Sequence, residues 1–284
     1  MKIIWVLENI ENDNSFYSKL HILLLLASVR LWKRNNPKDN CVLYTDVITR
    51  DLLHKLNVHH FWDSIELIPK YEGIDKKVFW AASKLQVLSI QNEPVIILDN
   101  DTLVFKPIRK YINLSKVYVC NFEIGKGYYP TSIDPFVQKI SYKTRWKTQS
   151  VNVSFLNLPN ASFTRRYANE SLNMMREFTA MGTPHSQYLI FAEQLLLRHM
   201  LDKEEIDFSS IISTYWDCKK WEWGEDHDKG IWTINESGLF FKHYGPLKSW
   251  IIDSLADQDY DTEIKLLENC INFPSLNIDI ISKP

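Results

Sequence analysis

The first hundred residues alternate between short apolar runs and helix-like segments, and this alternation limits the fold more than any other feature of the chain. Apolar runs typical of buried strands cover residues 2–9, 41–46, 64–69 and 94–101, and helical segments cover 18–35, 49–56 and 80–91. Strands that alternate with helices form parallel sheets with helices on both faces. The sequence therefore predicts an α/β fold with a mostly parallel central sheet.

The second half of the chain follows a more mixed pattern. Residues 116–124 and 150–158 are expected to form strands, 185–201 a helix, and 238–250 a strand that leads into a turn. No internal repeat, low-complexity tract or Pro/Gly/Ser-rich linker divides the chain. We therefore expect one domain over residues 1–284, with a parallel half at 1–115 and an elaborated half at 116–284.

Composition excludes several classes of function. The net charge is −2 and acidic and basic residues are mixed, so the chain has no electrostatic footprint for nucleic acid. The N-terminus reaches acidic residues too soon for a signal peptide. The longest apolar run, Ile22 to Ala27, is far shorter than the roughly 20 residues of a transmembrane helix. Four widely spaced cysteines without a CxxC pair indicate reduced thiols. We expect a cytoplasmic protein without a transmembrane segment.

The run PVIILDNDTLVFKPI places Asp99, Asn100 and Asp101 directly after a buried strand. Neighbouring carboxylates repel each other and are costly to desolvate unless a cation accompanies them. Alternate residues of an extended segment point the same way, so Asp99 and Asp101 are expected to aim at one point, with Asn100 facing away. Mg²⁺ and Mn²⁺ prefer such oxygen ligands. A solvated turn is the alternative for so short a motif. In parallel sheets, ligands bind beyond the carboxyl ends of the strands.

Residues 84–108, KLQVLSIQNEPVIILDNDTLVFKPI, resemble the Asp-x-Asp region of GT-A fold glycosyltransferases, most closely the glycogenin-like family 8 pattern. Three further segments resemble that family in the same order: VNVSFLNL, FAEQLLL and KHYGPLKSW. Together the resemblance covers roughly residues 2 to 250. The chain departs from the pattern where Gly245 follows His243 by two residues rather than three, where Ser249 replaces Pro, and where Glu193 replaces Asp.

The resemblance implies a nucleotide-binding half at 1–115, an acceptor-side half at 116–284 and roles for nine residues. It implies Asp99, Asp101 and His243 as ligands of Mn²⁺ or Mg²⁺, Lys84, Asn100, Asn152 and Lys248 as donor-binding residues, and Glu193 and Gln194 as catalytic residues. The implied partners are a nucleotide-sugar donor, with UDP ahead of GDP, and a carbohydrate or glycoconjugate acceptor. The implied transfer retains the anomeric configuration, whereas inversion would need Glu193 or Asp226 as a base. The chemistry agrees, because cations neutralise the charge that develops on a diphosphate leaving group.

Each of these residues also has a structural interpretation. Lys84 and Lys248 could be solvated, His243 could be a turn residue, and Asn152 could lie at a strand edge. Adjacent Glu193 and Gln194 do not share a helix face, so we expect one of them to point into the site. A group of tryptophans suits either a sugar ring or a core: Trp216, Trp221, Trp223 and Trp232.

Two other functions stay open. A nucleotidyltransferase can have the same fold, but it usually has a glycine-rich, basic loop near the first strand, and ENIENDNS offers neither Gly nor Lys. A non-catalytic carbohydrate-binding or partner-binding module would bind neither metal nor nucleotide.

Overall fold

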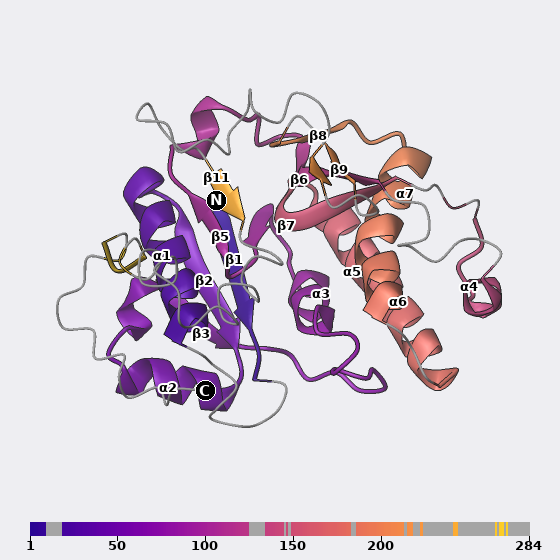
Figure 1. Ribbon diagram of the computed structural model, residues 1–284, viewed down its shortest axis with the longest axis horizontal. Helices are drawn as coiled ribbons and strands as arrows, with labels where there is room; N and C mark the ends of the chain where they lie inside the picture. The colour runs from indigo at the N-terminus through magenta and orange to yellow at the C-terminus, as the bar shows by residue number, and fades with distance from the viewer. Residues whose placement is uncertain are drawn as a thin grey trace. The chain divides into compact units, whose positions relative to one another are not determined.

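The computed structural model describes residues 1–9, 19–124, 134–144, 146, 149–182, 186–212, 215–217, 222–223, 241–243, 265, 267–269 and 271 (Figure 1). These residues form two compact units. The first takes its described residues from Met1–Leu67, Leu98–Tyr111 and Ile231–Pro284, and the second from Ile68–Ile97 and Ile112–Gly230. The single domain expected over residues 1–284 stays a prediction.

The first unit has a parallel sheet at its centre. Strand β1 (Lys2–Leu7) pairs in parallel with β2 (Asn40–Thr45), and β2 pairs in parallel with β3 (Ser64–Leu67). Its other elements are α1 (Lys19–Asn35), α2 (Val47–Lys55), the 3₁₀ turns η2 (His59–Phe61) and η3 (Ile108–Lys110), and the antiparallel pair β5 (Thr102–Val104) and β11 (Phe241–His243). The predicted alternation of strands and helices is confirmed, and with it the α/β class.

Helix α1 supplies much of the core of the first unit. Residues Ile22 to Ala27, the longest apolar run of the chain, are each at most 1% exposed. Lys33 and Arg34 occupy the last turn, where cations interact favourably with the helix dipole. The side chain of Trp5 in β1 donates from Nε1 to Ser28 Oγ at 2.9 Å, which ties the helix to the sheet.

Three hydrogen bonds hold the chain around β5 against α1, beside which it lies in Figure 1. Ser28 Oγ donates to the carbonyl of Thr102 at 2.6 Å, and Asn35 Nδ2 donates to the carbonyl of Val104 at 3.2 Å. The backbone amide of Ile108 donates to Asn36 at 3.1 Å. These bonds fix the strand that directly follows Asp101.

The second unit has an antiparallel centre with parallel strands along one edge. β6 (Val117–Ile124) pairs antiparallel with β7 (Ser150–Leu158), which neighbours β4 (Val95–Leu98); β8 (Phe208–Ser210) and β9 (Tyr215–Asp217) run parallel to β6, and β10 (Glu222–Trp223) pairs with β9. Its helices are α3 (Ala82–Ser89), α4 (Pro135–Lys139), α5 (Ala161–Ala180), α6 (Ser186–Ile190), the π-helix η4 (Phe191–Leu195) and α7 (Leu196–Lys203). This mixed pairing agrees with the mixed pattern expected after residue 115, whereas the division into halves at 1–115 and 116–284 stays a prediction.

Helix α5, with 20 residues, was not predicted from the sequence. Its Ser, Thr and Asn residues resemble a loop composition and compete for backbone hydrogen bonds. Its buried positions nevertheless recur at helical spacing: Phe163, Tyr167, Ser171, Met174 and Phe178. The Asn160 side chain accepts a hydrogen bond from the Phe163 amide at 3.0 Å and so caps the first turn.

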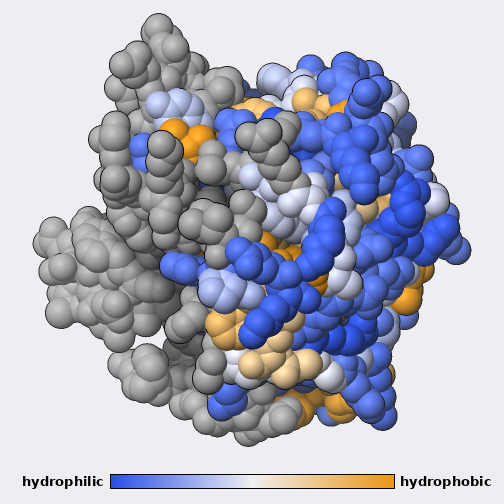
Figure 2. All heavy atoms as spheres, turned by 90° about the vertical axis from the view of Figure 1, so that its right-hand side faces the viewer, coloured by the Kyte–Doolittle hydropathy of each residue, from blue (hydrophilic) through white to orange (hydrophobic). Residues whose placement is uncertain are grey.

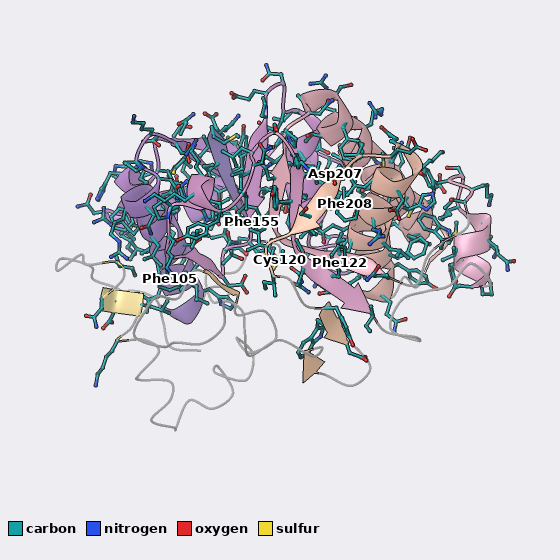
Figure 3. All side chains as sticks on the ribbon, turned by 90° about the horizontal axis from the view of Figure 1, so that it is seen from above. Phe105, Cys120, Phe122, Phe155, Asp207 and Phe208 are labelled. Carbon is teal, nitrogen blue, oxygen red and sulfur yellow. The ribbon has the colours of Figure 1, made fainter. Side chains whose placement is uncertain are left out.

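One face of the β6–β7 ladder carries apolar and aromatic side chains. Cys120 and Phe122 of β6 and Phe155 of β7 belong to it, and Figure 3 labels them near Phe208 of β8. The rings of Phe122 and Phe208 lie 5.9 Å apart, and the Arg198 guanidinium of α7 lies within 5.5 Å of both centroids. Helix α7 therefore packs on this face of the sheet through the Arg198 cation, which lies over two rings in an edge arrangement.

Most of the described atoms on the side shown in Figure 2 belong to hydrophilic residues, and apolar residues are scattered among them. None of the helices in the described ranges combines the length and the hydropathy that crossing a bilayer requires. Cys41 and Cys120 are buried free thiols, as expected for reduced cysteines. Burial raises the pKa of Cys41 to about 12, so its thiol stays protonated near neutral pH.

Candidate functional site

Polar groups join the carboxyl end of β1 to the segment that follows β4 and to the end of β2. Asn100 Nδ2 donates to the carbonyl of Val6 at 3.0 Å, and Thr45 Oγ1 donates to the carbonyl of Leu7 at 2.6 Å. These bonds lie at the strand ends where ligands bind in parallel sheets. The segment 99–101 is therefore anchored to this edge of the first unit.

Asp46, at the end of β2, has a structural role at the same edge. Its carboxylate accepts hydrogen bonds from the Asn9 amide at 2.7 Å and from the Thr49 amide at 2.9 Å. The second bond caps α2 at its N-terminus. Asp46 thus fastens the end of β1 to the start of α2.

Asp99, Asn100 and Asp101 belong to a turn. The amide of Thr102 donates to the carbonyl of Asp99 at 3.0 Å, which closes the turn before β5 begins. The expectation of an extended segment was therefore wrong, and its rule for alternate residues does not apply here. Asp101 is 5% exposed and Asp99 is half-buried, while the Asn100 amide is turned toward β1.

Strand β11 brings the backbone of His243 beside this turn. His243 pairs with Thr102, the residue directly after Asp101, in the antiparallel β5–β11 ladder. The side chain of His243 and all of Lys248 lie outside the described residues. Their expected roles stay predictions.

The turn has the donor set of a hard divalent cation. Asp99 and Asp101 supply carboxylate oxygens, and the buried Asn100 Oδ1 has no hydrogen-bond partner among the described residues. No group of three His, Cys, Asp or Glu side chains in that part of the chain is placed to hold a metal. The residues present therefore fit Mn²⁺ or Mg²⁺ if further ligands come from phosphate, water or His243.

In the second unit, the structure brings two predicted residues together. Lys84 Nζ of α3 lies 3.0 Å from Glu193 Oε1 of the π-helix, and the two side chains are only 13% and 6% exposed. The solvated interpretation of Lys84 is therefore wrong. Because the pair is largely buried, removing one charge from the other would leave an unpaired buried charge, which is strongly unfavourable. Both side chains are therefore held in place.

Glu193 and Gln194 lie in the π-helix η4, which interrupts the helical run between α6 and α7. Such π turns are rare and frequently occur at functional sites. Glu193 is buried and Gln194 is half-buried. Tyr167 donates from its hydroxyl to the Glu193 carbonyl at 3.0 Å, and burial, followed by the Glu193 charge, raises the pKa of this phenol well above 10. The phenol therefore stays a hydrogen-bond donor.

Asn152 of β7 is held by a residue that the sequence did not single out. Its Nδ2 donates to Glu123 Oε1 at 2.8 Å, and its Oδ1 accepts from the Ser154 amide at 3.0 Å. Glu123 is 8% exposed. The available signal was a glutamate inside the apolar strand VYVCNFEI, since buried glutamates are rare without a partner.

The tryptophan group is described only in part. The half-buried Trp216 lies in β9, opposite Glu123 of β6, and the backbone of Trp223 pairs with that of Trp216. Trp221, Trp232 and Asp226 lie outside the described residues.

Comparison with known families decides the membership of the chain. A model of DUF6734, a family of unknown function, matches residues 7–230. The chain belongs to this family. The match contains the turn at Asp99, the Lys84–Glu193 pair and Asn152, whereas His243 and Lys248 lie beyond it. No curated protein matches the DUF6734 chain.

Several solved structures are similar to the DUF6734 chain. The glycosyltransferase GlyE of Streptococcus pneumoniae TIGR4 is 11% identical at a TM-score of 0.40, over 74% of this chain and 44% of GlyE. The galactosyltransferase LgtC, in complex with donor and acceptor sugar analogues, is 13% identical at a TM-score of 0.49, over 100% of this chain and 98% of LgtC. PaToxG glycosyltransferase is 13% identical at a TM-score of 0.43, over 72% of this chain and 69% of PaToxG. The chain thus spans less than half of GlyE, and likenesses with TM-scores below 0.5 carry no activity over to it.

Proposed function

We propose that this DUF6734 chain is a metal-dependent glycosyltransferase. It moves a sugar from a nucleotide-sugar donor, UDP-linked rather than GDP-linked, to a carbohydrate or glycoconjugate acceptor with retention of configuration. The observation that carries the proposal is the turn of Asp99 and Asp101, which Asn100 anchors at 3.0 Å to the end of β1 and which β11 flanks at His243. Paired carboxylates at that edge match the Asp-x-Asp resemblance of the sequence.

In this proposal the first unit holds the diphosphate. Asp99 and Asp101 bind Mn²⁺ or Mg²⁺, with His243 as a third protein ligand, and Asn100 keeps the turn at the strand ends. When bound, the cation neutralises the negative charge that develops on the diphosphate as the glycosidic bond breaks. Lys248 adds a positive charge toward the same phosphates.

The second unit binds and orients the sugar. Glu193 holds Lys84 at 3.0 Å, so the ammonium is already positioned for the donor and little ordering is needed on binding. Asn152, which Glu123 orients at 2.8 Å, hydrogen-bonds to the sugar. Gln194 lines the reacting face of the ring and acts mainly in the transition state.

A panel of nucleotide sugars tests the proposal. The protein is incubated with each donor, Mn²⁺ and an array of acceptor glycans, and the products are identified by mass spectrometry. We expect release of the nucleotide and one added sugar mass from at least one UDP-linked donor, and neither from Asp101→Asn. Asp63→Asn is the matched control, since Asp63 pairs with Lys33 at 2.7 Å away from the turn. Pyrophosphate release from a sugar phosphate and a nucleoside triphosphate, without transfer, would instead identify a nucleotidyltransferase.

A further inference from the structure

The second face of the β6–β7 ladder changes from apolar to polar along its length. Residues two apart in a strand share a face. Val117 and Val119 of β6 begin this face as buried apolar side chains. Beyond them, the pairs across the ladder are Asn121 with Asn152 and Glu123 with Ser150. The register shifts between Val119 and Asn121, where the polar part begins, and such irregularities often re-aim side chains next to functional sites.

The polar end of this face is buried. Glu123 is 8% exposed and Ser150 is 0% exposed. Asn152 donates to Glu123 Oε1 at 2.8 Å, and this bond helps to hold the carboxylate in place. Ser150 Oγ, directly across the ladder, makes no hydrogen bond to the described residues. A buried hydroxyl without a partner is unfavourable, and such a group calls for a ligand or another explanation.

We infer that Glu123 and Ser150 form a subsite for the hydroxyl groups of a saccharide ring, beside Asn152, to which Glu123 is hydrogen-bonded. The inference rests on the proposed glycosyl transfer, because it names the groups that grip the sugar there. A carboxylate accepts protons from ring hydroxyls, and a serine hydroxyl both donates and accepts. The charge of Glu123 repels phosphate, so the ligand of this subsite is the neutral polyol.

Saccharide binding can be measured without nucleotide and without turnover. Saturation-transfer NMR with methyl glycosides of glucose, galactose and mannose is run on the full chain and on Glu123→Gln and Ser150→Ala. We expect transfer to at least one glycoside in the parent and about tenfold weaker binding in each variant. Ser150→Ala should not lower the thermal midpoint, because it removes a hydroxyl that has no partner in the described part of the chain. That variant therefore separates loss of binding from loss of fold.

Asp207→Asn is the matched control, since Asp207 is an exposed carboxylate of the second unit that pairs with Lys116. It should bind the glycosides as the parent does. A parent without saturation transfer to any glycoside, or variants that bind as well as the parent, would overturn the subsite. A parent that binds a glycoside through Glu123 and Ser150 but neither UDP nor UDP-sugar with Mn²⁺ would support the subsite while contradicting the proposed function.

Discussion

At the scale of single residues, the Lys84–Glu193 pair tests whether a buried ion pair contributes more to stability than an exposed one. Because both side chains are largely buried, removal of one partner leaves an uncompensated charge that costs about 3–5 kcal/mol. We expect Lys84→Met to lower the free energy of unfolding in urea by about 3 kcal/mol or more. Lys33→Met is the control, since the Lys33–Asp63 pair is 27% and 43% exposed and should cost about 1 kcal/mol or less. Equal losses in the two variants would show that the Lys84–Glu193 pair is not buried in solution.

Gln194 tests the division between binding and turnover. A group that lines the reacting face of the sugar acts more in the transition state than in the ground state. We expect Gln194→Ala to reduce kcat more than it weakens donor binding, measured by steady-state kinetics and by donor titration. If kcat stays within a factor of about two while the donor Kd rises, Gln194 contributes to binding alone.

The residues of the candidate site were predictable where one segment carried the signal. The carboxylates of Asp99 and Asp101 followed from an apolar strand that runs into acidic residues, and Lys84 and Gln194 followed from the family resemblance. The Glu123–Asn152 bond of 2.8 Å was not predictable, because the register between β6 and β7 decides it. Glu123 and Asn152 are 29 positions apart in the sequence, and only the pairing of their strands brings them within hydrogen-bond distance.

At the scale of elements, the N-terminal cap of α5 is worth a measurable stability. Asn160 accepts from the Phe163 amide at 3.0 Å, and loss of such a cap costs about 1 kcal/mol. We expect Asn160→Ala to lower the free energy of unfolding by about that amount. Asn169→Ala, on the exposed side of the same helix, should be neutral or slightly stabilising because alanine favours helix. The reverse order would contradict the capping geometry.

The turn η2 gives the stability of the first unit a pH dependence. Burial, followed by the charges of His54 and His60, lowers the pKa of His59 below its ordinary 6.5, and the rings of His54 and His59 stack at 4.1 Å. As the pH falls through 6.5, the unfolded chain binds a proton before the folded one does, so stability is lost. Urea midpoints at pH 7.5 and 5.5 should therefore converge more closely in His59→Gln than in the parent. An unchanged pH dependence in the variant would refute this role of His59.

Elements were predictable where apolar residues dominated them. The centres of β1 and β2, the whole of β4 and residues Ile22 to Ala27 of α1 appear as apolar runs, because these residues are buried. Helix α5 was missed because polar residues interrupt its apolar ones, and only the helical spacing of its buried residues marks it as a helix. The turn at Asp99 was predicted to be extended, because the order of side chains in the sequence does not reveal the hydrogen bond from the Thr102 amide to the Asp99 carbonyl.

At the scale of the whole molecule, the α/β class followed from the order of elements and is confirmed, with the parallel strands β1, β2 and β3 in the first unit and an antiparallel centre in the second. The pairing of β11 with β5 joins segments about 140 residues apart in sequence and was beyond any local pattern. That pairing places the His243 backbone opposite Thr102, which is the arrangement that the proposed metal site needs from the C-terminal part of the chain. The DUF6734 model ends at residue 230, so this contribution comes from outside the matched region.

The most direct test of the central claim is calorimetric titration of UDP into the parent and into Asp101→Asn, each with and without Mn²⁺. The account predicts that the parent binds UDP with Mn²⁺ and loses at least about tenfold in affinity when Mn²⁺ is omitted. Asp101→Asn should show that weak binding under both conditions, with a thermal midpoint equal to or slightly above that of the parent because a like-charge repulsion is gone. Equal affinity of parent and variant for UDP in the presence of Mn²⁺ would contradict it.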